Sequence, residues 1–488
     1  MSWFGEGEYW ITRLVMQRGV AFIYLIAFIN AVNQFRPLLG ERGLLPVALF
    51  LKRVRFRQAP SIFWLFPSDR AFAIAAWIGV ALAVFALSGY SEEFGLFTSI
   101  GVWLALWVIY LSFVNVGQTF YSFGWESILL ETGFLAIFLG SADVAPREEL
   151  IWLYRWVLFR VMFGAGLIKL RGDPCWRELT CLIYHYETQP IPNPLTWYFH
   201  RQPVWAHKAG VAFTHFVELA MPFAYFAPTP ICYVAGAVTV LFQGALILSG
   251  NLSWLNWLTI VLCIPCFDDA VYSRILPIEV PAELAAPFAF TVTVWALTGM
   301  VAMLSIRPIL NMISRRQKMN ASFDSLHLVN TYGAFGSINK RRTEVILEGT
   351  DESWVHAGTR WKEYGFKAKP GDTKRRPPVV SPYHLRLDWL MWFAAMGSYQ
   401  HYPWILNLIA KLLVNDKPVL RLIRHNPFPD APPRFIRAML YEYKLSTPQE
   451  WRATRQHWVR RPLRVYLPAL SIDDANFRAT LRRCGWIE

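Results

Sequence analysis

The chain has 488 residues, of which 55% are hydrophobic and 17% are charged, and its formal net charge is +14. The apolar residues stand in long blocks, which excludes an ordinary soluble protein and indicates a multi-pass membrane protein. A basic surplus in such a protein usually reflects loops that face anionic headgroups, and no DNA- or RNA-binding motif is present, so we expect membrane lipids and no nucleic acid as partners.

Nine apolar runs have roughly the length needed to cross a bilayer, about 17–25 residues. They lie near residues 14–33, 71–90, 95–115, 120–140, 151–170, 209–227, 231–249, 252–267 and 285–305. We therefore predict a polytopic α-helical bundle of about nine spans over residues 1–306. Between the first two runs, apolar residues at helical spacing are followed by four basic residues, which predicts an in-plane helix near 41–57. A loop helix packed on the rest of the protein is the alternative.

After Ile306 the charge rises and the long apolar runs stop. RTEVILEGT alternates as a strand does, and WKEYGFKAKPGD, RFIRAMLYEYKLS and RPLRVYLPAL also have strand patterns. RLDWLMWFAAM and PWILNLIAKLLVN resemble short helices. We predict a water-exposed α+β domain with a β-sheet over residues 307–488.

The stretch between the fifth and sixth runs is the most unusual part of the chain. Lys169 lies near the end of an apolar run, where a charge costs about 2.5–3.5 kcal/mol at the bilayer centre, so it is a functional candidate. Snorkelling of Lys169 to the headgroups is the alternative. The loop 171–208 that follows holds Cys175 and Cys181, which can form a disulfide in an oxidising compartment. Its histidines match no metal-binding spacing, so we expect no metal.

Several other ionisable residues fall within the apolar runs. Opposite charges on different runs indicate buried pairing, and the candidates are Glu126 and Glu131 with Arg155 and Arg160. His215 and Glu218 are three residues apart and share a helix face. With Lys169 they could form a catalytic group in which the lysine is a general base and the His–Glu pair supports it. A purely structural role in fixing helix packing is the alternative.

The motif FGAGLIKLRGDPCWRELTCLIYHYETQPIPNPLTWYFH resembles the signature of the lipase maturation factor family. The resemblance continues in GERGLLP and in NTYGAFGSINKRRTEVILEGTDESW, and it covers nearly the whole chain. It implies a membrane-bound factor that helps secreted lipase-like clients to fold and assemble. It also implies the endoplasmic reticulum membrane for a eukaryotic chain, whereas a bacterial member would occupy the cytoplasmic membrane.

A shorter stretch, AGLIKL, is similar to a motif of the vitamin K-dependent gamma-carboxylases. That similarity implies that Lys169 is the base of an enzyme, with His215 and Glu218 beside it, although Ile168 stands where the carboxylase has a second lysine. The alternative function is therefore an enzyme acting on a lipid-soluble, quinone-like substrate, with a lipid or quinone bound. We favour the folding factor over the enzyme.

The orientation of the C-terminal domain has conflicting indications. Nine spans that start in the cytosol place this domain and the cysteine loop on the exoplasmic side, as the family resemblance implies. The basic residues that follow the first span favour the opposite orientation. We expect the exoplasmic one, where the domain and the loop would form the client surface. Tryptophans are typical interface anchors, and the candidates are Trp354, Trp361, Trp389, Trp392 and Trp404.

Overall fold

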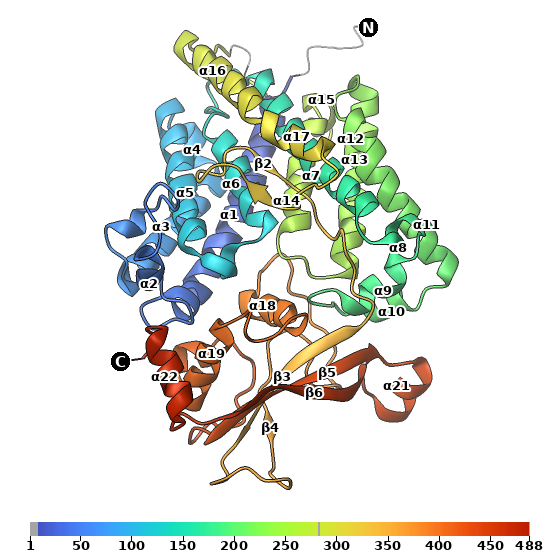
Figure 1. Ribbon diagram of the computed structural model, residues 1–488. Coiled ribbons are helices and arrows are strands. Elements are labelled where there is room, and N and C mark those ends of the chain that lie inside the picture. Colours follow the sequence, from blue (N-terminus) through green and yellow to red (C-terminus); the bar gives the residue numbers. More distant parts are fainter. Residues whose placement is uncertain (1–7, 282–283, 488) are drawn as a thin grey trace.

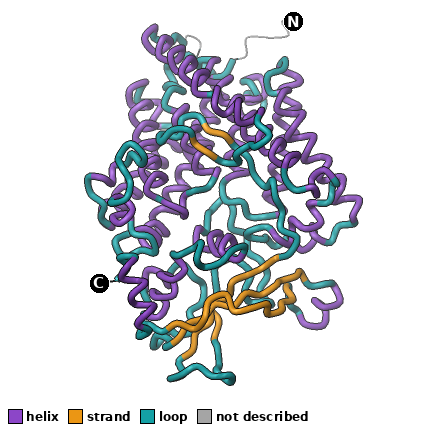
Figure 2. Tube along the Cα trace, viewed as in Figure 1, coloured by secondary structure: helices purple, strands orange, loops and turns teal. Residues whose placement is uncertain are grey.

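The computed structural model describes residues 8–281 and 284–487. A helical bundle forms one half of the molecule, and a β-sheet flanked by helices forms the other half (Figure 1). The start of the first helix and the C-terminal domain lie at opposite ends of the bundle. Strands gather almost entirely in the C-terminal half (Figure 2). The two-part organisation predicted from composition is therefore present.

Six helical stretches in the described chain are long and apolar enough to cross a membrane. They are α1 (Trp10–Leu39), α3 (Asp69–Ser88), α5 (Leu96–Val116), α7 (Glu148–Arg171), α13 (Thr229–Ser249) and α16 (Phe288–Leu304) continued by α17 (Ile306–Ile313). The last span thus extends beyond residue 306. α1, α5 and α7 bury more than half of their apolar window, and the other three bury a third or less. α1, α5 and α7 therefore form the centre of the bundle, and α3, α13 and the α16–α17 span present more surface to lipid.

The remaining three predicted spans are shorter or interrupted helices. They are α6 (Gly124–Ala136), α14 (Leu255–Cys263), and α11 (Val204–His215) joined to α12 (Met221–Ala224) by a π-helix, Phe216–Ala220. The prediction of about nine full-length spans was therefore wrong in number. α6 and α14 pack on neighbouring helices rather than standing alone in lipid. A segment covered by protein can satisfy its backbone without spanning the full hydrocarbon thickness.

The ends of the long helices carry recognisable signals. The Ser68 side chain accepts a hydrogen bond from the backbone N–H of Ala71 and caps α3, which ends at Gly89 with φ +95°. α7 has two acidic residues in its first turn and Lys169 and Arg171 in its last turn. These charges complement the helix dipole at both ends.

The region predicted as an in-plane helix contains only one short helix, α2 (Val47–Leu51). The predicted helix near 41–57 is therefore much longer than the helix that the structure has there. The basic residues that follow α2 form turns, and the side chain of Gln58 accepts a hydrogen bond from the backbone N–H of Arg55 at 2.9 Å. Other short helices connect the bundle, namely α4 (Tyr90–Glu93), α8 (Pro174–Arg177), α9 (Cys181–Thr188), α10 (Thr196–His200) and α15 (Asp269–Tyr272).

The C-terminal domain is built on an antiparallel sheet in the order β4-β3-β5-β6. Its strands are β3 (Arg342–Thr350), β4 (Lys362–Glu363), β5 (Phe435–Leu445) and β6 (Trp458–Leu470). Val345 and Leu347 point from β3 into the main core, to which α18 (Arg386–Ala395) and α19 (Trp404–Leu413) also contribute. A separate pair, β1 (Ala321–Ser322) and β2 (Asn330–Thr331), precedes the sheet. The other helices are α20 (Lys417–Leu420), α21 (Pro448–Thr454) and α22 (Ala475–Arg483).

Candidate functional site

Lys169 and Glu218 form a buried ion pair between α7 and the π-helix. The Lys169 ammonium donates to Oε1 of Glu218, and both side chains are almost fully buried. Gly166, one turn before Lys169, allows this approach, because a Cβ there would come within 3.0 Å of the Glu218 Cβ. Pro222 has no N–H to donate to the carbonyl of Glu218, which favours a local departure from the α-helix. π-Helical turns of this kind occur frequently at functional sites.

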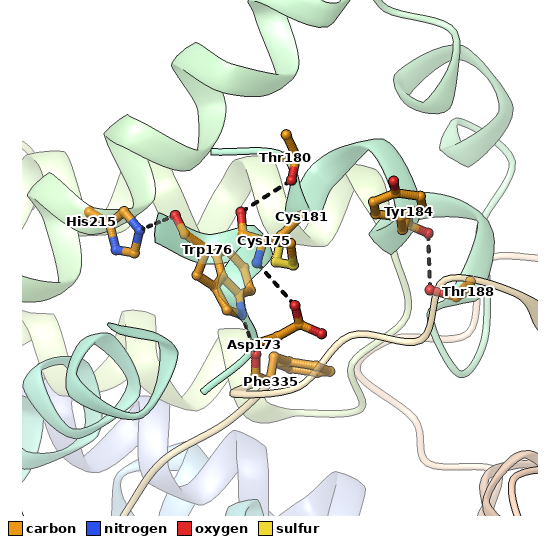
Figure 3. The surroundings of a disulfide bond; sticks show 9 residues. All are labelled: Asp173, Cys175, Trp176, Thr180, Cys181, Tyr184, Thr188, His215 and Phe335. Carbon is orange, nitrogen blue, oxygen red and sulfur yellow. Dashed lines mark hydrogen bonds between the residues drawn. A yellow bond between two sulfur atoms is a disulfide. The ribbon is translucent and has the colours of Figure 1, made fainter. Parts of the chain in front are cut away.

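His215 does not share the ion pair. Its Nε2 lies 3.0 Å from the backbone carbonyl oxygen of Trp176, so the ring faces the cysteine loop (Figure 3). The Trp176 ring in turn lies 5.2 Å from the Lys169 ammonium, measured to the ring centroid. The three residues predicted as one group are thus neighbours, but only Lys169 and Glu218 form an ion pair.

Cys175 and Cys181 are joined by a disulfide in the loop 171–208. The Asp173 side chain caps this turn by accepting from the backbone N–H of Cys175 at 3.0 Å (Figure 3). The indole N–H of Trp176 donates to the carbonyl of Phe335 at 2.9 Å. The disulfide turn is therefore attached to the segment that leads into the C-terminal sheet.

Glu131 and Arg160 form the second buried ion pair, between α6 and α7. The same Arg160 donates to the carbonyl of Asn330 at 2.6 Å, and Glu131 accepts from the backbone N–H of Asn330 at 3.0 Å. The Tyr332 hydroxyl donates to Glu131 at 2.6 Å. This cluster joins two bundle helices to β2.

The other two predicted partners do not pair with each other. Glu126 binds Arg386 of α18 at 2.7 Å and accepts a hydrogen bond from the Tyr110 hydroxyl. Arg155 donates to the carbonyl of Pro265 at 2.9 Å. Glu126 lies at the end of α6 that faces the C-terminal domain, where a cation from that domain can reach it. The predicted pairing of Glu126 with Arg155 or Arg160 is therefore absent, and that prediction was wrong.

His384, Asn330, Tyr332 and Arg386 are buried polar residues that the sequence did not indicate. His384 is surrounded by aromatic rings, and burial together with the neighbouring Arg386 holds the pKa of its imidazole well below the usual value. The sequence RLDWLMWF could have indicated that Arg386 is buried, because an arginine and an aspartate stand at the start of an apolar helix. Its partner Glu126 lies 260 residues away in sequence, which no local pattern reveals.

The loop 171–208 is bonded directly to the C-terminal sheet. Arg342 of β3 donates to the backbone carbonyls of Glu187, Gln189 and Pro190 at 3.0, 2.5 and 3.0 Å. The side chain of Glu187 accepts from the backbone N–H of Leu445 at 2.8 Å. Loop and sheet are therefore held directly against each other.

A cavity of about 400 Å³ lies between the bundle and the C-terminal domain. Both Lys169 and Glu218 line it. Its apolar walls come from both halves of the chain and include Phe123, Trp125, Met162, Phe242, Phe335, Trp389, Trp392 and Phe393. A mostly apolar pocket with a few convergent polar groups is the usual form of a small-molecule site. Across residues 8–281 and 284–487, no three His, Cys, Asp or Glu side chains are grouped to hold a metal ion.

The five tryptophans predicted as surface anchors have different environments. Trp389 and Trp404 are buried in the core, so they cannot serve as anchors. Trp392 is half-buried and lines the cavity, and its indole N–H donates to the carbonyl of Thr188 at 3.0 Å. Trp361 is half-buried, with the Arg437 guanidinium 4.2 Å from its ring centroid. Trp354 is 64% exposed.

The helical bundle, the six candidate spans and the attached β-sheet domain define a multi-pass membrane protein with a folded C-terminal domain. Two family models match the sequence, the lipase maturation factor transmembrane domain at residues 11–274 and the lipase maturation factor C-terminal domain at residues 328–468. The chain belongs to the lipase maturation factor family.

Curated relatives are similar over almost their whole length. Lipase maturation factor 1 of Bos taurus is 45% identical over 527 aligned positions, which cover 99% of this chain and 93% of the relative. Lipase maturation factor 1 of Homo sapiens is 43% identical, with 98% and 91% covered. Lipase maturation factor 2 of Rattus norvegicus is 30% identical, with 97% and 85% covered. No solved structure matches the chain.

Proposed function

We propose that this protein assists the maturation of secreted lipase-like clients, from the endoplasmic reticulum membrane and with its C-terminal domain in the lumen. The observation that carries the proposal is the similarity to lipase maturation factor 1, which extends over 99% of the chain and includes both domains. The disulfide between Cys175 and Cys181 suits an oxidising compartment such as this lumen.

The client surface in this proposal is formed by the C-terminal domain and the loop Cys175–His207. The hydrogen bonds of Arg342 and Glu187 hold these two parts together, so a client could contact both at once. Trp354 and, on or next to the loop, Tyr198 and Trp205 expose more than half of their surface. Large aromatic side chains of this kind are frequent binding anchors.

The alternative as an enzyme has weaker support. A general base needs its lone pair free, whereas the Lys169 nitrogen is engaged by the Glu218 carboxylate. His215, which would support the base, bonds to a backbone carbonyl instead. These contacts favour a structural or ligand-positioning role for the group.

The proposal is tested by complementation in cells that lack their own lipase maturation factors. The full chain is co-expressed with a dimeric secreted lipase, and lipase activity in the medium is measured per amount of lipase synthesised. We expect the chain to restore secreted activity without changing the export of an unrelated secreted protein. A well-expressed, folded chain that restores no lipase activity would overturn the proposal.

The client surface has its own test. Replacing the exposed anchor by Trp354→Ser should weaken co-purification of the lipase by about tenfold or more, as the loss of an interface hot spot does. Val379→Ser is the matched control, since Val379 is an apolar residue of another loop that is 74% exposed. Equal lipase recovery with both variants would remove Trp354 from the client surface.

A further inference from the structure

The cavity between the two halves of the chain has unpaired hydrogen-bonding groups in its wall. Asn256 of α14 is 2% exposed, and neither its amide oxygen nor its amide nitrogen has a partner among the described residues. Glu218 is 4% exposed. Lys169 binds its Oε1, and its Oε2 has no partner in the described chain. Buried polar atoms without partners are uncommon, since each costs free energy. Both residues line the cavity, as does Trp125, whose buried indole N–H also has no partner among the described residues. The wall therefore offers two donor groups and two acceptors to an occupant.

The charges in the cavity wall balance. The described residues that line it include one ammonium, from Lys169, and one carboxylate, from Glu218, and these two bind each other. His185 is the other titratable group beside them, and burial together with Lys169 lowers the pKa of its imidazole to about 4, so it is neutral at physiological pH. A charged occupant would find no counter-ion there, and burying an unpaired charge is costly. The wall thus favours a neutral molecule.

The shape of the cavity limits the size of the occupant. Its volume of about 400 Å³ is near the small end of the range of about 300–1,000 Å³ typical of small-molecule sites. The aromatic side chains of α6 and α18, among them Trp125 and Trp389, provide an apolar wall. This wall lies near α14, because the indole N–H of Trp254, the residue directly before α14, donates to the Trp125 carbonyl. This combination suits one acyl chain or a compact ring system with a polar group, and not a two-chain phospholipid.

We propose that this cavity binds a neutral lipid alcohol, such as a monoacylglycerol, whose hydroxyl group donates to Glu218 or Asn256 while its apolar body contacts the aromatic wall. A hydroxyl group is required because Glu218 offers a carboxylate oxygen, which accepts hydrogen bonds. An ester or ketone without a hydroxyl group could accept from the N–H groups of Asn256 and Trp125, but it would leave the Glu218 oxygen without a donor. This binding site is independent of the client surface and goes beyond the proposed assistance to lipases.

The test uses the full-length protein in nanodiscs and a monopalmitoylglycerol that carries a diazirine and an alkyne in its acyl chain. After photolysis, labelled peptides are mapped by mass spectrometry. We expect labels on peptides of α7, α14 or residues 319–339. Unlabelled monopalmitoylglycerol should compete strongly, whereas methyl palmitate, which lacks the hydroxyl group, and palmitate, which is charged, should compete weakly.

Variants separate the cavity from the surrounding lipid. Asn256→Leu should lower labelling about fivefold, the effect expected for one lost hydrogen bond. Ala165→Phe adds a ring to a position that lines the cavity and should abolish labelling. Gly244→Phe is the matched control, because a Cβ at Gly244 meets no other atom within 4 Å, and it should label like the parent protein. Each variant is first shown by size-exclusion chromatography and thermal unfolding to be folded.

Two kinds of result would overturn the proposal, labelling by bulk lipid and binding of an anion. The first is labelling that methyl palmitate suppresses as well as monopalmitoylglycerol does, or that persists in Ala165→Phe, since the probe would then report bulk lipid. The second is preferential competition by palmitate, which would mean that the cavity takes an anion. Neither result bears on the lipase complementation, so the two proposals can fail separately.

Discussion

Buried charges are the most demanding feature at the residue scale. Glu131 and Arg160 are nearly inaccessible to solvent, and four groups of Asn330 and Tyr332 form hydrogen bonds with them, whereas Arg160 Nε has no partner in the described chain. A buried ion pair contributes little net stability compared with apolar residues, but removing only one partner leaves an uncompensated charge. The cluster therefore acts chiefly by fixing α6, α7 and β2 in one arrangement.

The first prediction concerns this pair. Arg160→Met should destabilise the protein by about 3–5 kcal/mol, because Glu131 stays buried without its cation. Denaturant unfolding in detergent measures the loss. The double variant Arg160→Met with Glu131→Leu should recover part of it. Arg147→Met is the control, and its partly exposed pair with Glu149 should change stability by about 0–1 kcal/mol. A double variant as unstable as the sum of both single variants would contradict this account.

The second prediction concerns pH. His185 lies in α9, outside the candidate spans, and its pKa is lowered to about 4 by burial and by Lys169. Between about pH 6.5, the ordinary histidine value, and pH 4 the unfolded chain therefore binds more protons than the folded one. Stability should fall as the pH is lowered through this window, and His185→Phe should reduce that slope.

His200 provides an internal comparison for this titration. Burial lowers the pKa of its imidazole to about 4 as well, with Arg201 adding to the shift. The double variant His185→Phe with His200→Phe should flatten the acid side of the stability profile further than either single variant. Thermal unfolding at a series of pH values is the measurement. Identical slopes in all four proteins would show that neither ring stays neutral in the folded state.

Elements differ in how far their own sequence determines them. The β3 range was predicted residue for residue, because RTEVILEGT alternates and both faces of the strand are covered. The neighbouring β4 has only two residues, although WKEYGFKAKPGD has a strand pattern. The backbone N–H groups of Ala368 and Lys369 donate to the Asp388 carboxylate at 2.7 and 3.0 Å and not to another strand. From Gly365 onward the backbone therefore bonds to other parts of the domain, first to the carbonyl of His425 through the N–H of Gly365 and then to Asp388 of α18, and local pattern cannot reveal such contacts.

The same limit applies to the bundle and its site. Apolar length identified the six long spans, but it could not show that a π-helix interrupts the segment 209–227. Residue type singled out Lys169, Glu218, Glu131 and Arg160 as buried polar candidates. Their partners depended on packing, and Glu126 binds Arg386 from the other half of the chain. Sequence therefore indicated which residues needed partners, and the tertiary fold decided the pairs.

The third prediction concerns the contact between loop and sheet. Arg342→Met removes three hydrogen bonds to loop carbonyls, each contributing about 0.5–1.5 kcal/mol, and it also removes the buried ion pair with Glu344. Backbone hydrogen exchange in residues 181–200 should therefore accelerate at least about tenfold. Arg342→Lys should restore only part of the protection from exchange, because an ammonium cannot reproduce the planar guanidinium geometry. Arg341→Met is the control, since the Arg341 side chain is 76% exposed. Unchanged exchange in Arg342→Met would show that other contacts hold the loop.

At the scale of the whole molecule, the chain runs back and forth between two ends of the bundle. α6 starts beside Arg386 of the C-terminal domain, and the far end of the bundle is held by Asp269, which accepts from the backbone N–H groups of Trp10 and Thr12. The short helices α6 and α14 lie among the six long spans but are too short to be candidate spans themselves. In Figure 1 the start of α1 and the C-terminal domain lie at opposite ends of the bundle, and the orientation that we propose places these ends on opposite sides of the membrane.

The fourth prediction assigns those sides. Cys484, directly after α22, is free and partly exposed, whereas the other free cysteines, Cys232, Cys263 and Cys266, are buried. In sealed microsomes an impermeant maleimide should therefore leave the parent protein unlabelled until the membrane is permeabilised. Cys484→Ser should remove the label that permeabilisation allows, which assigns the signal to that thiol.

The opposite labelling pattern has a definite meaning. The helix α2 lies at the end of the bundle that carries the C-terminal domain (Figure 1), with Leu49 close to Gly485. Basic residues follow α2 directly, and the positive-inside rule would place them in the cytosol; they are Lys52, Arg53, Arg55 and Arg57. Labelling of Cys484 in intact microsomes would show that this rule governs the orientation. The C-terminal domain could then not meet a client in the lumen, and lipase maturation would have to act through the far side of the bundle. Protection of Cys484 would instead mean that these basic residues lie at the lumenal headgroups, where they can bind anionic lipid.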